Sequence, residues 1–175
     1  ASRGKIRFGL YTIKNLGESV ADSIIAERKR GGKFKSLSDF LDRIKDKNLN
    51  KKSFDALIKT GAMDEIGERG SLLANLENIL AYAKENSHKK DHQSLFGLMS
   101  DSSSVPDLKL APADPATSEQ KLKWERDLLG LFISGHPLDK YRETLESSGA
   151  SITKLKENDI EGSTVVIIGM IEETR

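Results

Sequence analysis

Cysteine is absent from this 175-residue chain, and aromatic residues make up only 6% of it. Without cysteine, the chain has neither a disulfide framework nor a thiolate zinc site, and its three histidines (His88, His92 and His136) lack the paired spacing of metal ligands. The longest apolar runs fall far short of the roughly 20 residues that a membrane-spanning helix requires, and no signal peptide is visible. We therefore expect a cytoplasmic chain with no metal and no membrane partner.

Charged residues are plentiful at 31%, and the hydrophobic content of 37% is sufficient for a modest core. The net charge of +1 hides an uneven distribution. Residues 1–60 carry 15 Lys and Arg against 7 Asp and Glu, whereas residues 61–175 carry 13 against 20. This asymmetry indicates a polyanion-binding surface in the first third of the chain, although the cations of a solvated helix face would give the same count.

Apolar residues recur at helical spacing in the first half of the chain. The pattern predicts a helix over 19–30, with Ser19 as the N-cap and Gly31–Gly32 as its end. It predicts further helices over 34–44, capped by Ser36 or Ser38, over 51–61, ended by Gly61, and over 71–86. A mainly α domain is therefore expected over residues 1–86.

Composition changes after this domain. Residues 87–116 are rich in Ser, Asp, Lys and Pro and predict an extended linker. Thr117 and Gln120 match a capping box, and Pro137 suits the first turn of a second short helix, so we expect a helical segment over 117–161. The apolar, β-branched run in residues 162–175 predicts a strand with no later strand to pair with. This arrangement is typical of a piece of a larger protein.

Residues 13–24, IKNLGESVADSI, have the spacing of a helix-hairpin-helix: Ile13, Leu16 and Ala21 occupy its apolar or small positions around Gly17. Asn15 and Gly17 tolerate the positive φ of a tight turn. Such a turn points backbone N–H groups outward at the positive end of a helix dipole, which favours a phosphate and makes DNA binding independent of base sequence. The candidate DNA-binding residues are Lys14, Asn15, Leu16, Gly17, Glu18, Ser19, Arg28, Lys29, Arg30 and Lys33. The alternative is a hairpin used only for packing.

A weaker copy of the hairpin pattern occurs in residues 57–76, where Ile58, Gly61 and Met63 precede another helix. Two such hairpins can hold both strands of a duplex, which predicts a tandem arrangement. The alternative is an ordinary helix that ends at a glycine. The candidate residues of this second hairpin are Lys59, Thr60, Gly61, Ala62 and Met63.

Five strings carry a family resemblance: IRFGLYTIKNLGESVADSIIAER, FKSLSDFLDRI, FDALIKTGAMDEIGERGSLLANL, SLFG and LGLFISGHPLDKY. In this order they resemble the alpha subunit of bacterial DNA polymerase III. The resemblance implies a tandem helix-hairpin-helix domain that binds duplex DNA, and an OB-fold whose first strand is 162–175, truncated in this chain. It also implies other replicase subunits as partners.

The resemblance further implies a peptide at 91–97 that binds the sliding clamp (beta subunit), with Leu95 and Phe96 as its apolar anchors. His92 stands where a Gln is usual, and Gln93 follows one residue later. Leu95 and Phe96 folding back onto the chain's own helices is the alternative. The candidate clamp-binding residues are His92, Gln93, Ser94, Leu95 and Phe96.

Catalysis is not expected within this chain, because its carboxylates are scattered and do not form the cluster that holds two Mg²⁺ ions. The resemblance places Mg²⁺ and the polymerase chemistry elsewhere in the parent enzyme, and we expect no cofactor here. His136, beside Pro137, is expected to cap or pack a turn. Two alternative functions are a scaffold that recruits the clamp without binding DNA, and a helix-hairpin-helix module of a DNA repair enzyme.

Overall fold

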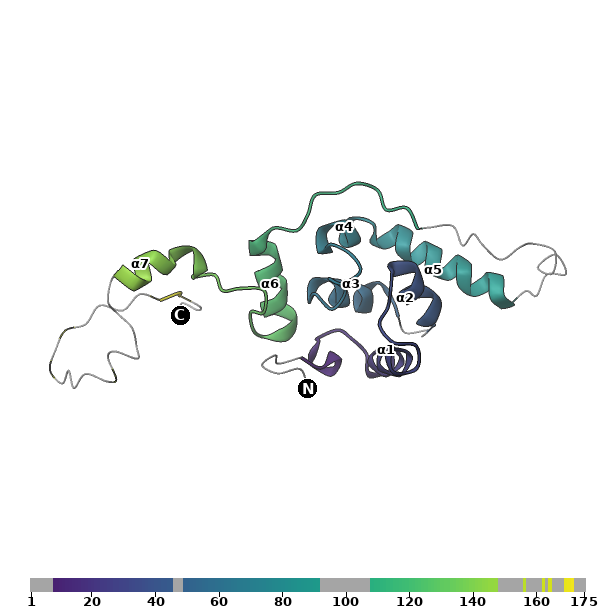
Figure 1. The fold of residues 1–175 in the computed structure, drawn as a ribbon, viewed down its shortest axis with the longest axis horizontal. Helices are drawn as coiled ribbons and strands as arrows, with labels where there is room; N and C mark the ends of the chain where they lie inside the picture. Colours follow the sequence, from purple (N-terminus) through teal and green to yellow (C-terminus); the bar gives the residue numbers. More distant parts are fainter. Residues whose placement is uncertain are drawn as a thin grey trace. The chain divides into compact units, whose positions relative to one another are not determined.

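The computed structural model describes residues 8–45, 49–91, 108–147, 156, 162, 164 and 169–171. The chain divides into two compact units, Ala1–Phe132 and Ile133–Arg175. The described part is helical, and no strand occurs among these residues (Figure 1). No helix among them is long and apolar enough to cross a membrane.

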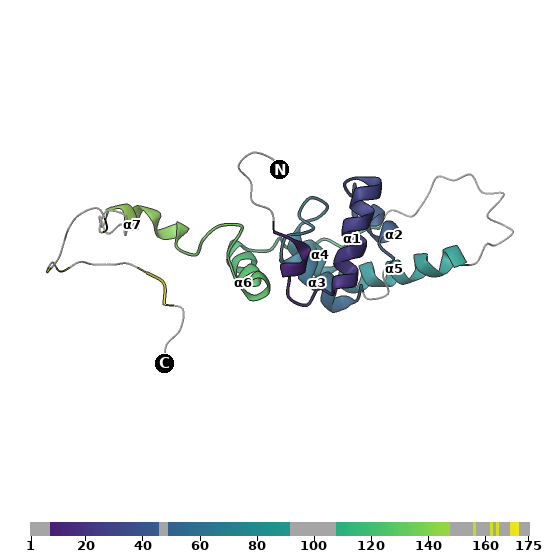
Figure 2. The ribbon, with the colours of Figure 1, turned by 90° about the horizontal axis from the view of Figure 1, so that it is seen from below.

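The first unit contains a short 3₁₀ turn, η1 (Leu10–Thr12), and six helices: α1 (Glu18–Gly31), α2 (Leu37–Arg43), α3 (Lys51–Lys59), α4 (Arg69–Ala74), α5 (Leu76–Asp91) and α6 (Ser118–Leu129). The second unit contains the 3₁₀ turn η3 (Asp139–Tyr141) and helix α7 (Arg142–Ser147). Figure 2 shows α1 along its length, beside α2 and α3. The mainly α fold predicted from the sequence is therefore confirmed.

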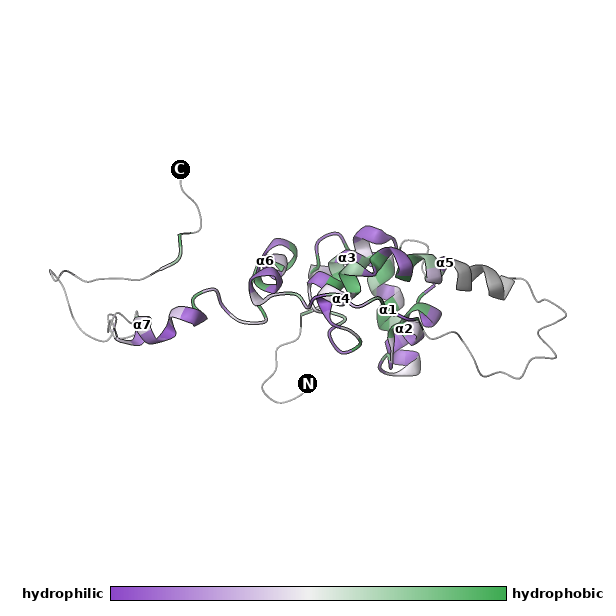
Figure 3. Ribbon diagram, turned by 90° about the horizontal axis from the view of Figure 1, so that it is seen from above, coloured by the Kyte–Doolittle hydropathy of each residue, from purple (hydrophilic) through white to green (hydrophobic). Residues whose placement is uncertain are grey.

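Helix α3 lies at the centre of the first unit, where it packs against α4, α5 and α6. Its side chains Phe54, Leu57 and Ile58 are at most 2% exposed. In Figure 3, green hydrophobic segments alternate with purple hydrophilic ones along the ribbons of α3 and α1. Burial of such side chains contributes about 1.5–3 kcal/mol each, so this helix anchors the unit.

Side-chain caps start several helices where the sequence predicts them. The Ser36 hydroxyl accepts the Asp39 N–H at the start of α2, at 3.1 Å. Thr117 and Gln120 form the predicted capping box of α6, with the Thr117 N–H donating to the Gln120 side chain at 2.8 Å. Helix α1 differs, because its N-cap is Gly17 and not Ser19.

The single helix predicted over 71–86 is two helices, α4 and α5, which meet at Asn75. The Asn75 side chain is 2% exposed and donates to the Ser71 carbonyl at 2.8 Å and to the Ala111 carbonyl at 3.0 Å. Its carbonyl oxygen accepts the Ala111 N–H at 2.8 Å. Asn favours such local bonds over a regular helix, and here they join the helix boundary to a segment 36 residues later.

Residues 108–117, which belong to the predicted linker and its end, lie along α4 and α5 before α6 begins (Figure 1). Leu108 and Leu110 pack against the core, and the backbone of residues 114–116 lies directly on Gly70. A Cβ at Gly70 would come within 2.6 Å of the Ala116 nitrogen, so the close approach requires glycine. We call residues 108–117 the strap.

The structure groups the residues differently from the predicted domain boundaries. Helix α5 continues to Asp91 rather than ending near residue 86, and α6 belongs to the first unit although it was assigned to a separate helical segment at 117–161. The described residues of the predicted OB-fold segment, at 162, 164 and 169–171, contain no strand, and the rest of 162–175 lies outside the described residues. The OB-fold strand therefore stays a prediction.

Candidate nucleic-acid interface

The first hairpin turn joins η1 to α1. Ile13 is 6% exposed and extended, and its carbonyl accepts the Leu16 N–H at 3.3 Å. Asn15 has φ of 69°, the one positive value at a non-glycine position in the described chain. Leu16 is half-buried and packs against the core below the turn. The predicted roles of Ile13, Asn15 and Leu16 in a tight turn are therefore confirmed.

Gly17 begins α1 in an extended conformation, with φ of −69° and ψ of 145°. Its carbonyl accepts the N–H groups of Val20 and Ala21, both at 3.1 Å, and it has no side chain to cap the first turn. A Cβ placed on Gly17 would meet no atom within 4 Å. The sequence suggested that Gly17 adopts a positive φ, and the structure shows that it does not. Its lack of a side chain instead leaves the backbone at the helix N-terminus open to a ligand.

The second hairpin turn has a different geometry. After α3, Gly61 has φ of 77°, the Gly61 N–H donates to Ile58 at 3.0 Å, and the Ala62 N–H donates to Leu57 at 3.1 Å. This pair of bonds is a Schellman motif, which closes a helix C-terminus. The turn thus uses the N–H groups of Gly61 and Ala62 internally and presents no long helix N-terminus, because α4 starts only at Arg69.

Side chains of the second turn are largely occupied. Thr60 and Met63 are 8% and 3% exposed. The Thr60 hydroxyl donates to the Ala56 carbonyl at 2.8 Å. The Lys59 ammonium pairs with Asp55 at 2.8 Å and lies 5.9 Å from the centre of the Trp124 ring. Of the five candidates in this turn, Ala62 is the exposed one.

The basic residues predicted to help bind phosphate lie at the far end of α1 from the first turn (Figure 2). A helix of 14 residues spans roughly 20 Å, so Arg28, Lys29 and Arg30 do not share one site with Gly17. Arg30 pairs with Glu27 at 2.8 Å, and Lys33 pairs with Glu65 at 3.0 Å. We call the exposed side chains of Arg28, Lys29, Arg30 and Lys33 the basic end of α1.

Arg43 holds that basic end in place, and sequence reasoning did not identify it. Its guanidinium donates to the Glu27 carbonyl at 2.6 Å and the Gly32 carbonyl at 3.2 Å, and lies 4.4 Å from the centre of the Phe34 ring. The carbonyls at a helix C-terminus carry partial negative charge, which a half-buried cation such as Arg43 stabilises. The sequence shows only that Arg43 follows α1; the bonds depend on how α2 folds back.

Arg69 is a second residue that sequence reasoning missed. It is 4% exposed, and its guanidinium contacts Asp64 on one side at 2.8 Å and Glu125 of α6 on the other at 2.8 Å. The same group donates to the Lys59 carbonyl at 3.1 Å, at the end of α3. Burial opposes its charge, but the hydrogen bonds that Arg69 donates to Asp64 and Glu125 keep its pKa above the ordinary value.

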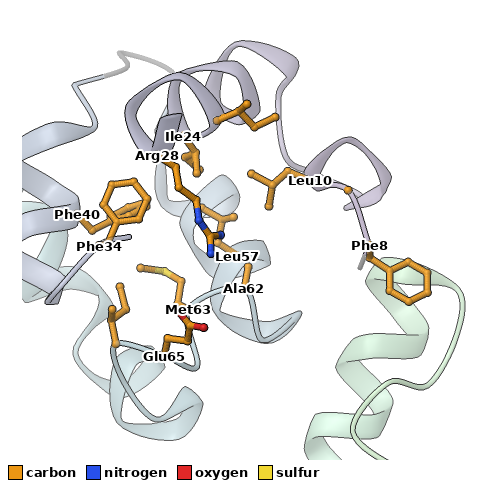
Figure 4. A pocket seen from close by; sticks show the side chains of 13 residues that line it. Phe8, Leu10, Ile24, Arg28, Phe34, Phe40, Leu57, Ala62, Met63 and Glu65 are labelled. Carbon is orange, nitrogen blue, oxygen red and sulfur yellow. The ribbon is translucent and has the colours of Figure 1, made fainter. Parts of the chain in front are cut away.

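A cavity of about 260 Å³ lies between η1, α1 and the turn after α3 (Figure 4). Its lining is mainly apolar, including Leu10, Phe40 and Leu57, with Arg28 and Glu65 as its charged members. Met63, a candidate of the second hairpin, points into this cavity rather than into solvent. Its role is therefore in packing.

The other sequence-predicted positions are placed as follows. The clamp-binding candidates His92, Gln93, Ser94, Leu95 and Phe96 lie outside the described residues. His136 shapes a turn, as expected: its N–H donates to Asp139 at 2.6 Å, and its Nδ1 accepts the Leu138 N–H at 3.2 Å. Within the described ranges, no group of three His, Asp or Glu side chains is arranged to hold a metal ion.

Comparison with known proteins agrees with this geometry. A family defined as a helix-hairpin-helix motif matches residues 1–72. The chain is 38% identical to DNA polymerase III subunit alpha of Thermus aquaticus over 97% of its length, and 37% identical to that of Aquifex aeolicus over 98%. With the subunit of Haemophilus influenzae it shares 32% identity over 99% of its length.

The chain spans only a small share of these relatives, namely 14%, 13% and 15% of their respective lengths. The match nevertheless covers nearly all of this chain, and it includes both hairpin turns, the strap and α6. The chain therefore belongs to the DNA polymerase III alpha subunit family and corresponds to a part of that subunit that carries a helix-hairpin-helix motif.

Proposed function

We propose that this chain binds double-stranded DNA without sequence preference, through backbone phosphates, as part of the alpha subunit of a replicative DNA polymerase. The observation that carries the proposal is the open N-terminus of α1. Gly17 places no side chain over the first turn, and a Cβ there would meet no protein atom within 4 Å. Amide groups and the helix dipole at such a site favour an anion.

The charges around the N-terminus of α1 determine how tightly and how selectively this site can bind DNA. Lys14 and the basic end of α1 supply cations, while the exposed Glu18 places a like charge next to the phosphate. Backbone donors read no base edges, so the contact holds the duplex rather than selecting a sequence. We expect weak binding whose affinity falls steeply with salt, because the release of counterions from DNA is less favourable in a more concentrated salt solution.

The first prediction tests this contact by fluorescence anisotropy with mixed-sequence duplexes at two salt concentrations. Gly17→Ala adds a methyl group that the free protein accommodates. We expect the Tm to change little, while DNA affinity falls about 3- to 10-fold, the loss of roughly 1 kcal/mol that one anion–helix contact provides.

Gly9→Ala is the matched control, because Gly9 is also extended and a Cβ there also meets nothing within 4 Å. It should bind as the unmodified chain does. Absence of binding by the unmodified chain at low salt would favour the scaffold alternative. Cleavage or base release would favour the repair-enzyme alternative.

In the cell, we propose that the chain guides the duplex for a DNA-directed DNA polymerase in the bacterial cytoplasm, together with other replicase subunits. The support is the near-complete match to alpha subunits. The polymerase active site with its Mg²⁺ ions would then lie elsewhere in the parent protein. The second hairpin is proposed as a supporting contact to the same duplex, through exposed Ala62 and the nearby Lys59.

Residues 92–96 are proposed to bind the sliding clamp, on the support of the string DHQSLFG and the family match. The second prediction is that Leu95→Ala with Phe96→Ala abolishes capture by the clamp and leaves DNA affinity unchanged, because the two apolar anchors are lost. Surface plasmon resonance with immobilised clamp measures this. Leu98→Ala serves as the control, and equal capture of the double variant would remove the assignment.

A further inference from the structure

Helix α6 contacts both hairpin turns, although it follows them by more than 50 residues in the chain. At the first turn, the Lys14 N–H donates to the Leu128 carbonyl at 3.0 Å. At the second, Glu125 accepts Arg69 at 2.8 Å, and Arg69 also donates to the Lys59 carbonyl at 3.1 Å. One helical turn of α6 therefore bonds directly to the backbone of the first hairpin turn. It bonds to the backbone of the second turn through the Arg69 side chain.

The bond between Arg69 and Glu125 is buried, which makes its geometry demanding. Glu125 is 0% exposed and Arg69 is 4% exposed. A charge removed from water requires its partner in place, and a guanidinium binds a carboxylate in a fixed orientation. Gly61 belongs to the same arrangement: a Cβ there would come within 2.8 Å of both the Arg69 guanidinium carbon and Asp64. The Arg69 side chain thus lies directly against the second turn.

The strap and the start of α6 add further fixation. The Glu68 carboxylate accepts the Ala116 N–H at 3.0 Å and pairs with Lys121 of α6 at 3.1 Å. Helix α6 is therefore attached near its start to α4 and near its end to the first turn. A helix attached at both places has little freedom to rotate or slide.

We propose that α6 is the positioning element of the DNA contact, with Arg69 and Glu125 as positioning residues that set the second turn relative to the first. This inference rests on the proposed DNA binding. A contact at the first turn and a supporting contact at Ala62 and Lys59 can act on one duplex only at a fixed separation, because phosphates repeat at fixed intervals along the strand. The bond from Lys14 to Leu128 and the bridge from Glu125 through Arg69 to Lys59 provide that separation. The DNA-binding unit accordingly extends to α6, beyond the residues that match the motif family.

The decisive variant replaces the ion pair with apolar side chains, Arg69→Met with Glu125→Leu. Such replacement of a buried pair often preserves overall stability, so the chain stays folded while the bridge from α6 to Lys59 is lost. Glu125→Gln is the milder variant, which retains an oxygen acceptor. Asp127→Asn is the matched control: it removes an exposed carboxylate from the same helix.

Three measurements are made on the full chain. Circular dichroism melting establishes that each variant folds. Amide hydrogen exchange by NMR reports the bond from Lys14 to Leu128. Anisotropy over a range of salt concentrations gives the slope of log K against log [salt], which counts the phosphates contacted.

For the folded double variant we expect exchange of the Lys14 amide to be about tenfold faster, since local opening increases. DNA affinity should fall several-fold, with a salt slope reduced by about one phosphate contact. Asp127→Asn should change the affinity slightly and leave Lys14 exchange as it was.

A folded double variant with unchanged Lys14 protection and unchanged salt slope would overturn the inference. If the double variant does not fold, Glu125→Gln decides by the same two readouts. If the unmodified chain binds no DNA, the proposed function fails, whereas the Lys14 exchange rate still tests the coupling through α6.

Discussion

At the residue scale, Asn15 and Gly17 have different roles in the first hairpin turn. Asn15 takes the left-handed conformation, with φ of 69°. Gly17 has an ordinary negative φ and contributes open space instead. The two residues thus affect different properties: Asn15 affects the stability of the turn, and Gly17 affects access to the helix N-terminus.

The third prediction concerns Asn15. Asn15→Ala should lower the free energy of unfolding by about 1 kcal/mol, because a Cβ without a local hydrogen-bonding group disfavours the left-handed region. Asn15→Gly should stay within about 0.5 kcal/mol of the unmodified chain, since glycine adopts positive φ without strain. Urea denaturation at neutral pH measures both, with Lys14→Ala as the neighbouring control. If Asn15→Ala were as stable as the unmodified chain, the positive φ of Asn15 would not contribute to stability as proposed.

At the element scale, the strap and α6 complete the first unit. Asn75 pairs with Ala111 by two hydrogen bonds, and Glu68 links α4 to Ala116 and Lys121. Burial raises the pKa of the Glu68 carboxyl, but hydrogen bonds from Ser71, Lys121, Ala116 and Gly70 outweigh it and lower the pKa below its ordinary value. The ionised carboxylate therefore stabilises the attachment of the strap.

The fourth prediction follows from the direction of that shift. A carboxyl whose folded pKa is depressed contributes stability above its unfolded pKa, about 4.3, and the contribution is lost as the pH falls through the folded value. Glu68→Gln should therefore be less stable than the unmodified chain at pH 7, and the difference should shrink below about pH 4. Urea denaturation at both pH values measures it.

Asp114→Asn is the control for this pH effect, because Asp114 is an exposed carboxylate on the same strap. It should show a small difference from the unmodified chain at either pH. A destabilisation by Glu68→Gln that is the same at pH 7 and in acid would contradict the assigned role of the carboxylate.

At the scale of the whole molecule, the first unit joins segments that are distant in sequence. The core helix α3 lies between α4, α5 and α6, and the hairpin turns at residues 14–17 and 59–62 both contact α6. The basic excess of residues 1–60 thus lies on a unit that also includes α6, whose Glu125 pairs with Arg69 inside the protein. The net charge of +1 therefore does not describe the surface that DNA would meet.

Several elements could be predicted from local sequence because local rules govern them. Helix α1, the capping box at Thr117 and the positive φ at Asn15 each depend on residues within a few positions of one another. The family resemblance, which the comparisons confirm, likewise follows from the order of short strings. Such features need no knowledge of the tertiary fold.

The sequence by itself thus determined the helical class, the first hairpin turn and the polymerase family. Only the tertiary structure decided that Asn75 breaks the helix predicted over 71–86 and that α6 belongs to the hairpin unit. The physical reason is the distance along the sequence. Asn75 bonds with Ala111, 36 residues later, and Arg69 bonds with Glu125, 56 residues later. A local sequence pattern does not reveal which residue so far along the chain is the partner.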